Sequence, residues 1–198
     1  MFSKLLYAYL DWTMRKIPPP NTMKTLAEII PTLALSFVGR QESPKGSNKG
    51  IDLNEFFEAD NFDPNGDAPG DDGYPWCAAF VDRVVQVAME QGGKEYTFKR
   101  PTTASAYGFE AWSLKQDSST KTIKIIKRDT IKAGDIVMFE KFSHVAIAVT
   151  DADSQGYFET VEGNTNGQGG REGFEVAHKK GASRRYWLSV RSLIRFTV

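Results

Sequence analysis

The chain has 198 residues, of which 40% are hydrophobic, 12% aromatic and 25% charged, a composition that fits an ordinary globular protein and excludes global disorder. Lys and Arg together number 25, as do Asp and Glu, so the formal net charge is zero. This balance gives no footprint of nucleic-acid binding, and it argues against simple electrostatic capture by an anionic surface.

The N-terminal residues 2–16 have the pattern of a short amphipathic helix. Three consecutive prolines at 18–20 terminate this helix. Its apolar run stops at Asp11 and has no small-residue cleavage site behind it, so it is a poor secretory signal. No stretch reaches the roughly 18 apolar residues that span a bilayer, and we expect no stable membrane insertion. The sequence predicts a helical extension over residues 1–22, packed on the main domain or lying on a membrane surface, and one domain over residues 23–198.

Helical patterns dominate the first half of this domain. Apolar residues at helical spacing predict helices over 25–38, 51–59, 75–90 and 103–112. Pro31 is expected to kink the first helix or to break it into two.

The pattern changes to strands in the second half. Runs rich in β-branched and aromatic residues, separated by turn residues, predict strands over 122–126, 135–139, 145–150, 157–162 and 187–196. Helices first and strands second predict an α+β fold, in which N-terminal helices pack on an antiparallel β-sheet.

Cys77 is the only cysteine, and it lies near the predicted start of the helix over 75–90. A helix N-terminus offers unpaired backbone N–H groups and the positive end of the helix dipole, and both stabilise a thiolate. A single cysteine cannot form an internal disulfide, so it is an inert buried thiol or a nucleophile, and its flanking residues favour the nucleophile. Tyr74 and Trp76 are predicted to line a substrate cleft beside it, with packing into the core as the alternative for Trp76.

A thiol nucleophile needs a base, and the chain has only two histidines. His144 comes directly before the predicted strand over 145–150, which would hold an imidazole at the end of a rigid element. It is the predicted catalytic partner of Cys77, against the alternative of a structural histidine at a strand end. His178 lies in a polar stretch and is expected to be exposed.

A third polar group usually orients the imidazole through its other nitrogen. Glu162 and Asn164 end the predicted strand over 157–162 and share one face with Thr160, because strand side chains two residues apart point the same way. Glu162 is the predicted orienting residue, since a carboxylate also stabilises the imidazolium. Asn164 is the alternative orienting residue or a second polar group in the cleft, and a solvated strand end is the remaining interpretation.

The acidic loop before Cys77 carries oxygen ligands at alternate positions, as calcium loops do: Asp63, Asn65 and Asp67. It departs from that pattern, because Ala68 stands where the glycine is expected and Tyr74 stands at the twelfth position instead of glutamate. An ordinary acidic turn is therefore favoured over a calcium site. One cysteine and two separated histidines supply no zinc ligand set, so we expect no cofactor, with calcium as the alternative.

The motif Tyr-Pro-Trp-Cys-Ala-Ala-Phe-Val at 74–81 resembles the nucleophile motif of the CHAP family, the cysteine, histidine-dependent amidohydrolases/peptidases. These are papain-like enzymes that cut amide bonds in peptidoglycan. The resemblance covers roughly residues 30 to 196. It continues, in the family's order, through a helix and Gly-x-x-Glu loop, a Gly-Asp strand, the histidine motif and the acidic motif, at residues 35–48, 132–139, 143–146 and 161–165.

The resemblance implies a papain-like fold and acyl transfer, with Cys77 as nucleophile, His144 as general base and acid, and Glu162 as the orienting residue. The backbone N–H of Cys77 is placed to stabilise the tetrahedral oxyanion. Papain-like enzymes often add a side-chain amide upstream of the cysteine, but Asp71 and Asp72 occupy that neighbourhood here, so no second donor is named.

The predicted function is a cysteine-dependent peptidoglycan amide hydrolase, either an endopeptidase or an N-acetylmuramoyl-L-alanine amidase. Without a recognisable signal peptide, it is expected to be made in the bacterial cytoplasm and to act in the periplasm or cell wall after dedicated export or lysis. A secreted antibacterial toxin paired with an immunity protein is favoured over a phage lysis enzyme. The rival classes are a non-catalytic cell-wall-binding or interaction module and a thiol hydrolase with a substrate outside the wall.

Overall fold

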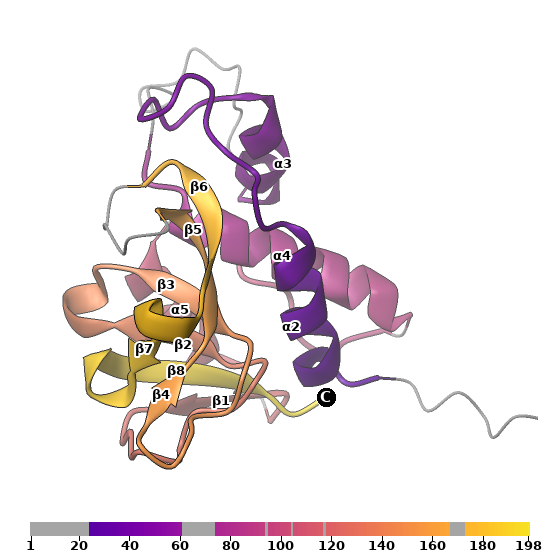
Figure 1. Cartoon of the computed structure of the whole chain (residues 1–198). Helices are drawn as coiled ribbons and strands as arrows, with labels where there is room; N and C mark the ends of the chain where they lie inside the picture. The colour runs from indigo at the N-terminus through magenta and orange to yellow at the C-terminus, as the bar shows by residue number, and fades with distance from the viewer. Residues whose placement is uncertain (1–23, 61–73, 94, 104, 117, 167–172) are drawn as a thin grey trace, which may run out of the picture.

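The computed structural model describes residues 24–60, 74–93, 95–103, 105–116, 118–166 and 173–198. In these residues helices come first and strands second, which confirms the predicted α+β class (Figure 1). The helices are α2 (Leu26–Ser36), α3 (Ile51–Ala59), α4 (Cys77–Gly92) and α5 (Ala106–Ser113). The predicted N-terminal helix over 2–16 lies outside the described residues.

The longer strands form a six-stranded sheet in the order β1-β8-β2-β3-β5-β6, with every neighbouring pair antiparallel. β4 and β7 pair separately, also antiparallel. The strands are β1 (Thr120–Ile123), β2 (Ile136–Phe139), β3 (Val145–Ala148), β4 (Tyr157–Phe158), β5 (Thr160–Thr165), β6 (Glu175–Lys179), β7 (Arg185–Tyr186) and β8 (Val190–Phe196). Short 3-10 helices are η1 (Glu140–Phe142), η2 (Gly181–Ser183) and η3 (Trp187–Ser189).

Two predicted strands differ from the structure in a way that pairing explains. The strand predicted over 157–162 is two strands, because β4 pairs with β7 whereas β5 pairs with β3 and β6. The strand predicted over 187–196 begins only at Val190, after η3. β6 and β7 have no counterpart among the predicted strands.

The sheet is covered on both faces, so the central strands β2 and β3 are buried at every position. One face packs on the helices through alternate residues such as Ile136, Met138 and Ile147, which join the larger core. The opposite face carries a smaller core around Val137 and Phe158. Figure 1 shows α2 and α4 running along one side of the sheet.

Pro31 does not break α2, which runs without interruption from Leu26 to Ser36. The break into two short helices is therefore not observed, and the alternative of a kink at Pro31 stays a prediction. Leu26, Ile30 and Ala34 share one buried face on both sides of the proline, so tertiary burial outweighs the hydrogen bond that proline cannot donate. The helix also begins with a capping box, in which Thr25 N–H donates to Glu28 Oε2 at 2.7 Å.

Helix α4 is the element that carries the thiol. It begins at Cys77, with Trp76 as N-cap, and ends at Gly92, followed by the C-cap Gly93, whose left-handed φ of 63° suits a glycine. Trp76 makes no side-chain cap hydrogen bond, so no cap side chain covers the N–H groups of the first turn. Pro75 lies before the helix and not inside its first turn.

Candidate active site

Cys77 is the first residue of α4 and is only 8% exposed. Its position follows from Trp76, which is fully buried, stacks on Phe56 at 5.7 Å between ring centroids, and donates its indole N–H to Glu42 Oε1 at 2.9 Å. The prediction that Trp76 lines a substrate cleft is therefore wrong. The indole anchors the helix start from inside the core.

His144 lies directly before β3 and is 7% exposed. Its ring stacks on Phe139 at 6.0 Å between centroids. The turn before it is strained, because Lys141 and Phe142 both have left-handed φ values, of 59° and 50°. Tertiary contacts hold this turn: Tyr107 meets the Phe142 ring edge-on at 5.2 Å and the Arg191 guanidinium lies 4.5 Å from its centroid.

Glu162 lies in β5, and its neighbour Gly163 explains how this strand approaches the thiol. A Cβ at Gly163 would meet Phe80 Cβ at 2.6 Å and the Trp76 ring at 2.8 Å. Both neighbours belong to the first turn of α4 or its cap, so β5 passes directly against the start of the helix. Only glycine permits this approach.

The structure brings the three predicted residues together in one hydrogen-bonded line. His144 Nε2 lies 3.1 Å from Glu162 Oε2, and the imidazole also forms a hydrogen bond with the Cys77 thiol. Because Glu162 occupies Nε2, Nδ1 is the nitrogen left for the sulfur. This is the order of nucleophile, base and orienting group that acyl transfer by a thiol requires.

The Glu162 carboxylate is fully buried, and further hydrogen bonds fix it. Thr160 donates its hydroxyl to Oε1 at 2.5 Å. Arg185 forms a fork, with Nε donating to Oε1 at 2.7 Å and Nη2 to Oε2 at 2.6 Å. The buried Lys179 is a further cationic neighbour, and its ammonium donates to the carbonyl of Asn166.

The electrostatics of the line favour an ion pair of thiolate and imidazolium. Burial alone would raise the pKa of the Cys77 thiol, but the hydrogen bond and charge of His144, with the N–H groups of Val145 and Ala78, lower it below its ordinary value. Burial opposes the charged form of His144, yet Cys77 and Glu162 together raise its pKa to about 9. Burial likewise opposes ionised Glu162, but Arg185 and His144 hold its pKa well below the usual range.

Asn164 is buried at the irregular end of β5, with a left-handed φ of 52°. His144 Nε2 is paired with Glu162, so the alternative in which Asn164 orients the imidazole is not the observed arrangement. Its Oδ1 has no hydrogen-bond partner in the described part of the chain. A role for Asn164 as a second polar group in the cleft stays a prediction.

The remaining predicted site residues lie in or beside the acidic loop. Tyr74 is 43% exposed, three residues before the nucleophile, and its cleft role stays a prediction. The calcium candidates Asp63, Asn65 and Asp67 lie outside the described residues, as do Asp71 and Asp72. Within residues that the structure does describe, no group of three or more His, Cys, Asp or Glu side chains could hold a metal ion.

No helix in the described ranges is both long and apolar enough to cross a bilayer.

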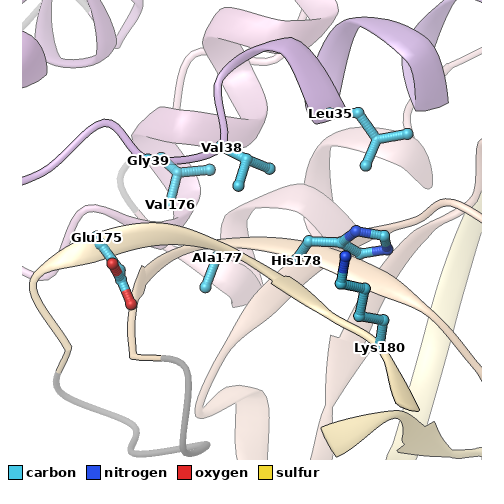
Figure 2. Close-up of a pocket in the computed structure, with 8 residues that line it drawn as sticks. All are labelled: Leu35, Val38, Gly39, Glu175, Val176, Ala177, His178 and Lys180. Atoms are coloured by element: carbon cyan, nitrogen blue, oxygen red, sulfur yellow. The ribbon is translucent and has the colours of Figure 1, made fainter.

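A separate pocket of about 370 Å³ lies between the end of α2 and β6 (Figure 2). None of the three residues in the hydrogen-bonded line borders it; its lining is Leu35, Val38, Gly39, Glu175, Val176, Ala177, His178 and Lys180. His178 is not the exposed residue that the sequence predicts, because its ring borders this pocket and its Nε2 lies 2.8 Å from Glu159 Oε2.

Sequence reasoning missed two contributors to the site, Arg185 and Glu42. Arg185 lies 23 positions after its partner Glu162 in a two-residue strand, so no local pattern connects them. Glu42 belongs to the Gly-x-x-Glu loop, but its contact with Trp76 joins residues 34 positions apart. The contribution of Thr160 could be found from the sequence, because strand periodicity places its side chain on the same face as that of Glu162.

Residues 69–164 match the family model described as the CHAP domain. No curated protein matches the chain. Among solved structures, the chain is similar to the crystal structure of a wild type endolysin, LysIME-EF1, with 17% sequence identity and a TM-score of 0.47, over 87% of this chain and 64% of that chain. It thus spans less than two thirds of that endolysin. The matched segment contains Cys77, His144 and Glu162.

Proposed function

We propose that this protein is a hydrolase of amide bonds in peptidoglycan that works through a cysteine nucleophile. The observation that carries the proposal is the line from the Cys77 thiol through His144 to the buried Glu162, set at the start of α4. The match of residues 69–164 to the CHAP domain model supports the substrate class. Cys77 is the nucleophile, His144 the general base and acid, and Glu162 the residue that orients the imidazole.

The chemistry follows from the positions of these groups. His144 takes the proton of Cys77, and the sulfur attacks the amide carbonyl to form a carbon–sulfur bond. The backbone N–H of Cys77 at the helix start donates to the oxyanion. His144 then gives its proton to the leaving nitrogen as the carbon–nitrogen bond breaks and a thioester remains.

Water completes the cycle. His144 removes a proton from a water molecule, which attacks the thioester carbonyl. The carbon–sulfur bond breaks, the acyl group leaves as a carboxylic acid, and the pair of Cys77 thiolate and His144 imidazolium is restored. Glu162 keeps the imidazole in one orientation throughout and stabilises its charged form.

Digestion of purified sacculi tests the proposal. Wild type should release fragments with new amine ends, and mass spectrometry should place them either within the cross-linked peptides, for an endopeptidase, or at the first alanine of the stem, for an amidase. Cys77→Ala and Cys77→Ser should release none, while both keep the wild-type melting temperature. Intact sacculi with wild type would refute the substrate class, and equal release by Cys77→Ala would refute the nucleophile.

We further propose delivery to the periplasm of a rival bacterium as a toxin, with phage-driven lysis as the alternative. The supporting observation is the formal net charge of zero, which gives the protein no overall electrostatic attraction to an anionic wall surface. A version directed to the periplasm of a test bacterium should lyse it, and its Cys77→Ala variant should not. A toxin further implies a producer protein that binds the Cys77→Ala variant and blocks sacculus digestion, whereas a lysis enzyme needs none.

A further inference from the structure

Glu162 faces His144 on one side and Arg185 on the other. The guanidinium of Arg185 binds both carboxylate oxygens, at 2.7 and 2.6 Å, while His144 Nε2 lies 3.1 Å from Oε2. The geometry points to Arg185 as a positioning residue for His144 that acts through Glu162. The measurements of kcat on sacculi rest on the proposed function, whereas the measurements of Cys77 alkylation do not.

The fork leaves the carboxylate no alternative orientation. Oε1 accepts from Thr160 and from Arg185 Nε, and Oε2 meets His144 and Arg185 Nη2. A rotation that removed Oε2 from the imidazole would break both bonds of the fork. Bidentate, charge-assisted pairs of this kind fix geometry as well as charge, and a lysine ammonium cannot reproduce them.

Phe139 connects Arg185 to His144 a second time. The guanidinium carbon lies 4.9 Å from the Phe139 ring centroid, and the His144 ring stacks on the same phenyl group at 6.0 Å. One aromatic ring therefore supports both the imidazole and the cation that clamps its carboxylate. Arg185 itself belongs to β7, which pairs through it with Phe158 of the smaller core.

The charge of Arg185 acts in the same direction as its geometry. Glu162 is fully buried, so it needs cationic partners to stay ionised. An ionised, fixed Glu162 stabilises the imidazolium, and the imidazolium in turn stabilises the Cys77 thiolate. The Cys77 thiolate would be less stable relative to the thiol if the cation were lost, if the fork were lost, or if the Glu162 carboxylate rotated.

Two variants separate geometry from charge, and Arg184 supplies a matched control. Arg185→Met removes both, and Arg185→Lys keeps the charge alone. Arg184→Met removes the neighbouring guanidinium, which pairs with Asp153 at 2.8 Å, away from the thiol. The rate of Cys77 alkylation by iodoacetamide, measured against pH, reports thiolate formation without any peptidoglycan substrate.

We expect Arg185→Met to move the alkylation midpoint up by about 1 on the pH scale, and to lower kcat on sacculi about 10- to 100-fold with KM within about twofold. Arg185→Lys should recover most of the midpoint but only part of kcat. Arg184→Met should match wild type in both.

An Arg185→Met protein that folds and keeps the wild-type midpoint and kcat overturns the inference, as does a loss confined to KM. If Arg185→Met fails to fold, Arg185→Lys decides, because a folded lysine variant with wild-type kcat shows that the fork is not needed. If wild type leaves sacculi intact, the proposed function fails, and the alkylation midpoints still test the role of Arg185.

Discussion

Two histidine–carboxylate pairs lie on the sheet, and they share a similar hydrogen bond but differ in burial and in their neighbouring groups. His144 and Glu162 are 3.1 Å apart, and His178 and Glu159 are 2.8 Å apart, each through Nε2. The side chains of the first pair are 8% and 0% exposed, and those of the second 19% and 29%. The pair with the shorter distance is thus the more exposed pair. A short histidine–carboxylate distance therefore does not by itself mark an active site.

Burial and neighbouring charges make the difference. Among the contacts of the described residues, only in the first pair does the imidazole form a hydrogen bond with a thiol and the carboxylate bind both nitrogens of an arginine fork. Desolvation makes each interaction at the buried pair stronger and each missing partner more costly. Changes at the two pairs should therefore have very different consequences.

Replacing the two histidines in turn should give the largest contrast. His144→Ala removes the base and the leaving-group acid, so kcat/KM on sacculi should fall by about 10³-fold or more. His178→Ala should stay within about twofold of wild type, because its ring borders a pocket apart from Cys77. Initial rates of amine release, with circular dichroism to verify folding, measure both; equal losses would refute the assignment of the base.

Replacing the two carboxylates comes next. Glu162→Gln keeps the shape of the side chain but presents an amide N–H₂ to the Arg185 fork, so donors face donors and a cation loses its buried counter-ion. We expect kcat to fall about 10²-fold or more, and the free energy of unfolding to drop by about 3 kcal/mol.

Glu159→Gln is the matched control and should change the free energy of unfolding by less than about 1 kcal/mol, since its ion pair is partly exposed. Denaturant titrations and sacculus assays measure both variants. A Glu162→Gln protein as active as Glu159→Gln would contradict the orienting role.

Two glycines extend the comparison to the backbone. Gly163→Ala places a Cβ 2.6 Å from Phe80 Cβ, so β5 must move away from α4, and we expect a loss of about 1–3 kcal/mol together with lower kcat. Gly181→Ala, just beyond β6, meets nothing within 4 Å but has a φ of 58°, so it should cost about 1 kcal/mol of strain without affecting kcat. Thermal melting and sacculus rates distinguish the two, and a Gly163→Ala protein with wild-type kcat would show that the close approach does not position the site.

The residues of the hydrogen-bonded line could be predicted because each lies in or directly beside a patterned element. Cys77 opens an amphipathic helix, His144 precedes an apolar strand, and Glu162 lies in a run rich in β-branched and aromatic residues. The α+β class followed from the same patterns. Local periodicity and motif order suffice where a side chain's role depends on its own element.

The rest depends on contacts between distant parts of the chain. Arg185 reaches Glu162 only because β4 and β7 pair, and two-residue strands leave no periodic signal. β6 is missed because Glu175–Lys179 mixes charged and apolar residues without alternation. Trp76 looked equally suited to a cleft or a core, and only Phe56 and Glu42, contributed by other segments, decide for the core.

The pH dependence of activity should give the smallest shift and the sharpest comparison between the pairs. The imidazolium of His144 is present below its raised pKa of about 9, and the thiolate forms above the lowered pKa of Cys77, so kcat/KM should follow a bell with its alkaline limb near pH 9. Glu162→Gln removes a group that stabilises the imidazolium, so the alkaline limb should move down by about 1 on the pH scale. Glu159→Gln changes only the partner of His178 and should leave both limbs in place. If the alkaline limb moved in Glu159→Gln and not in Glu162→Gln, His178 would be the catalytic histidine and the assignment of His144 would be wrong.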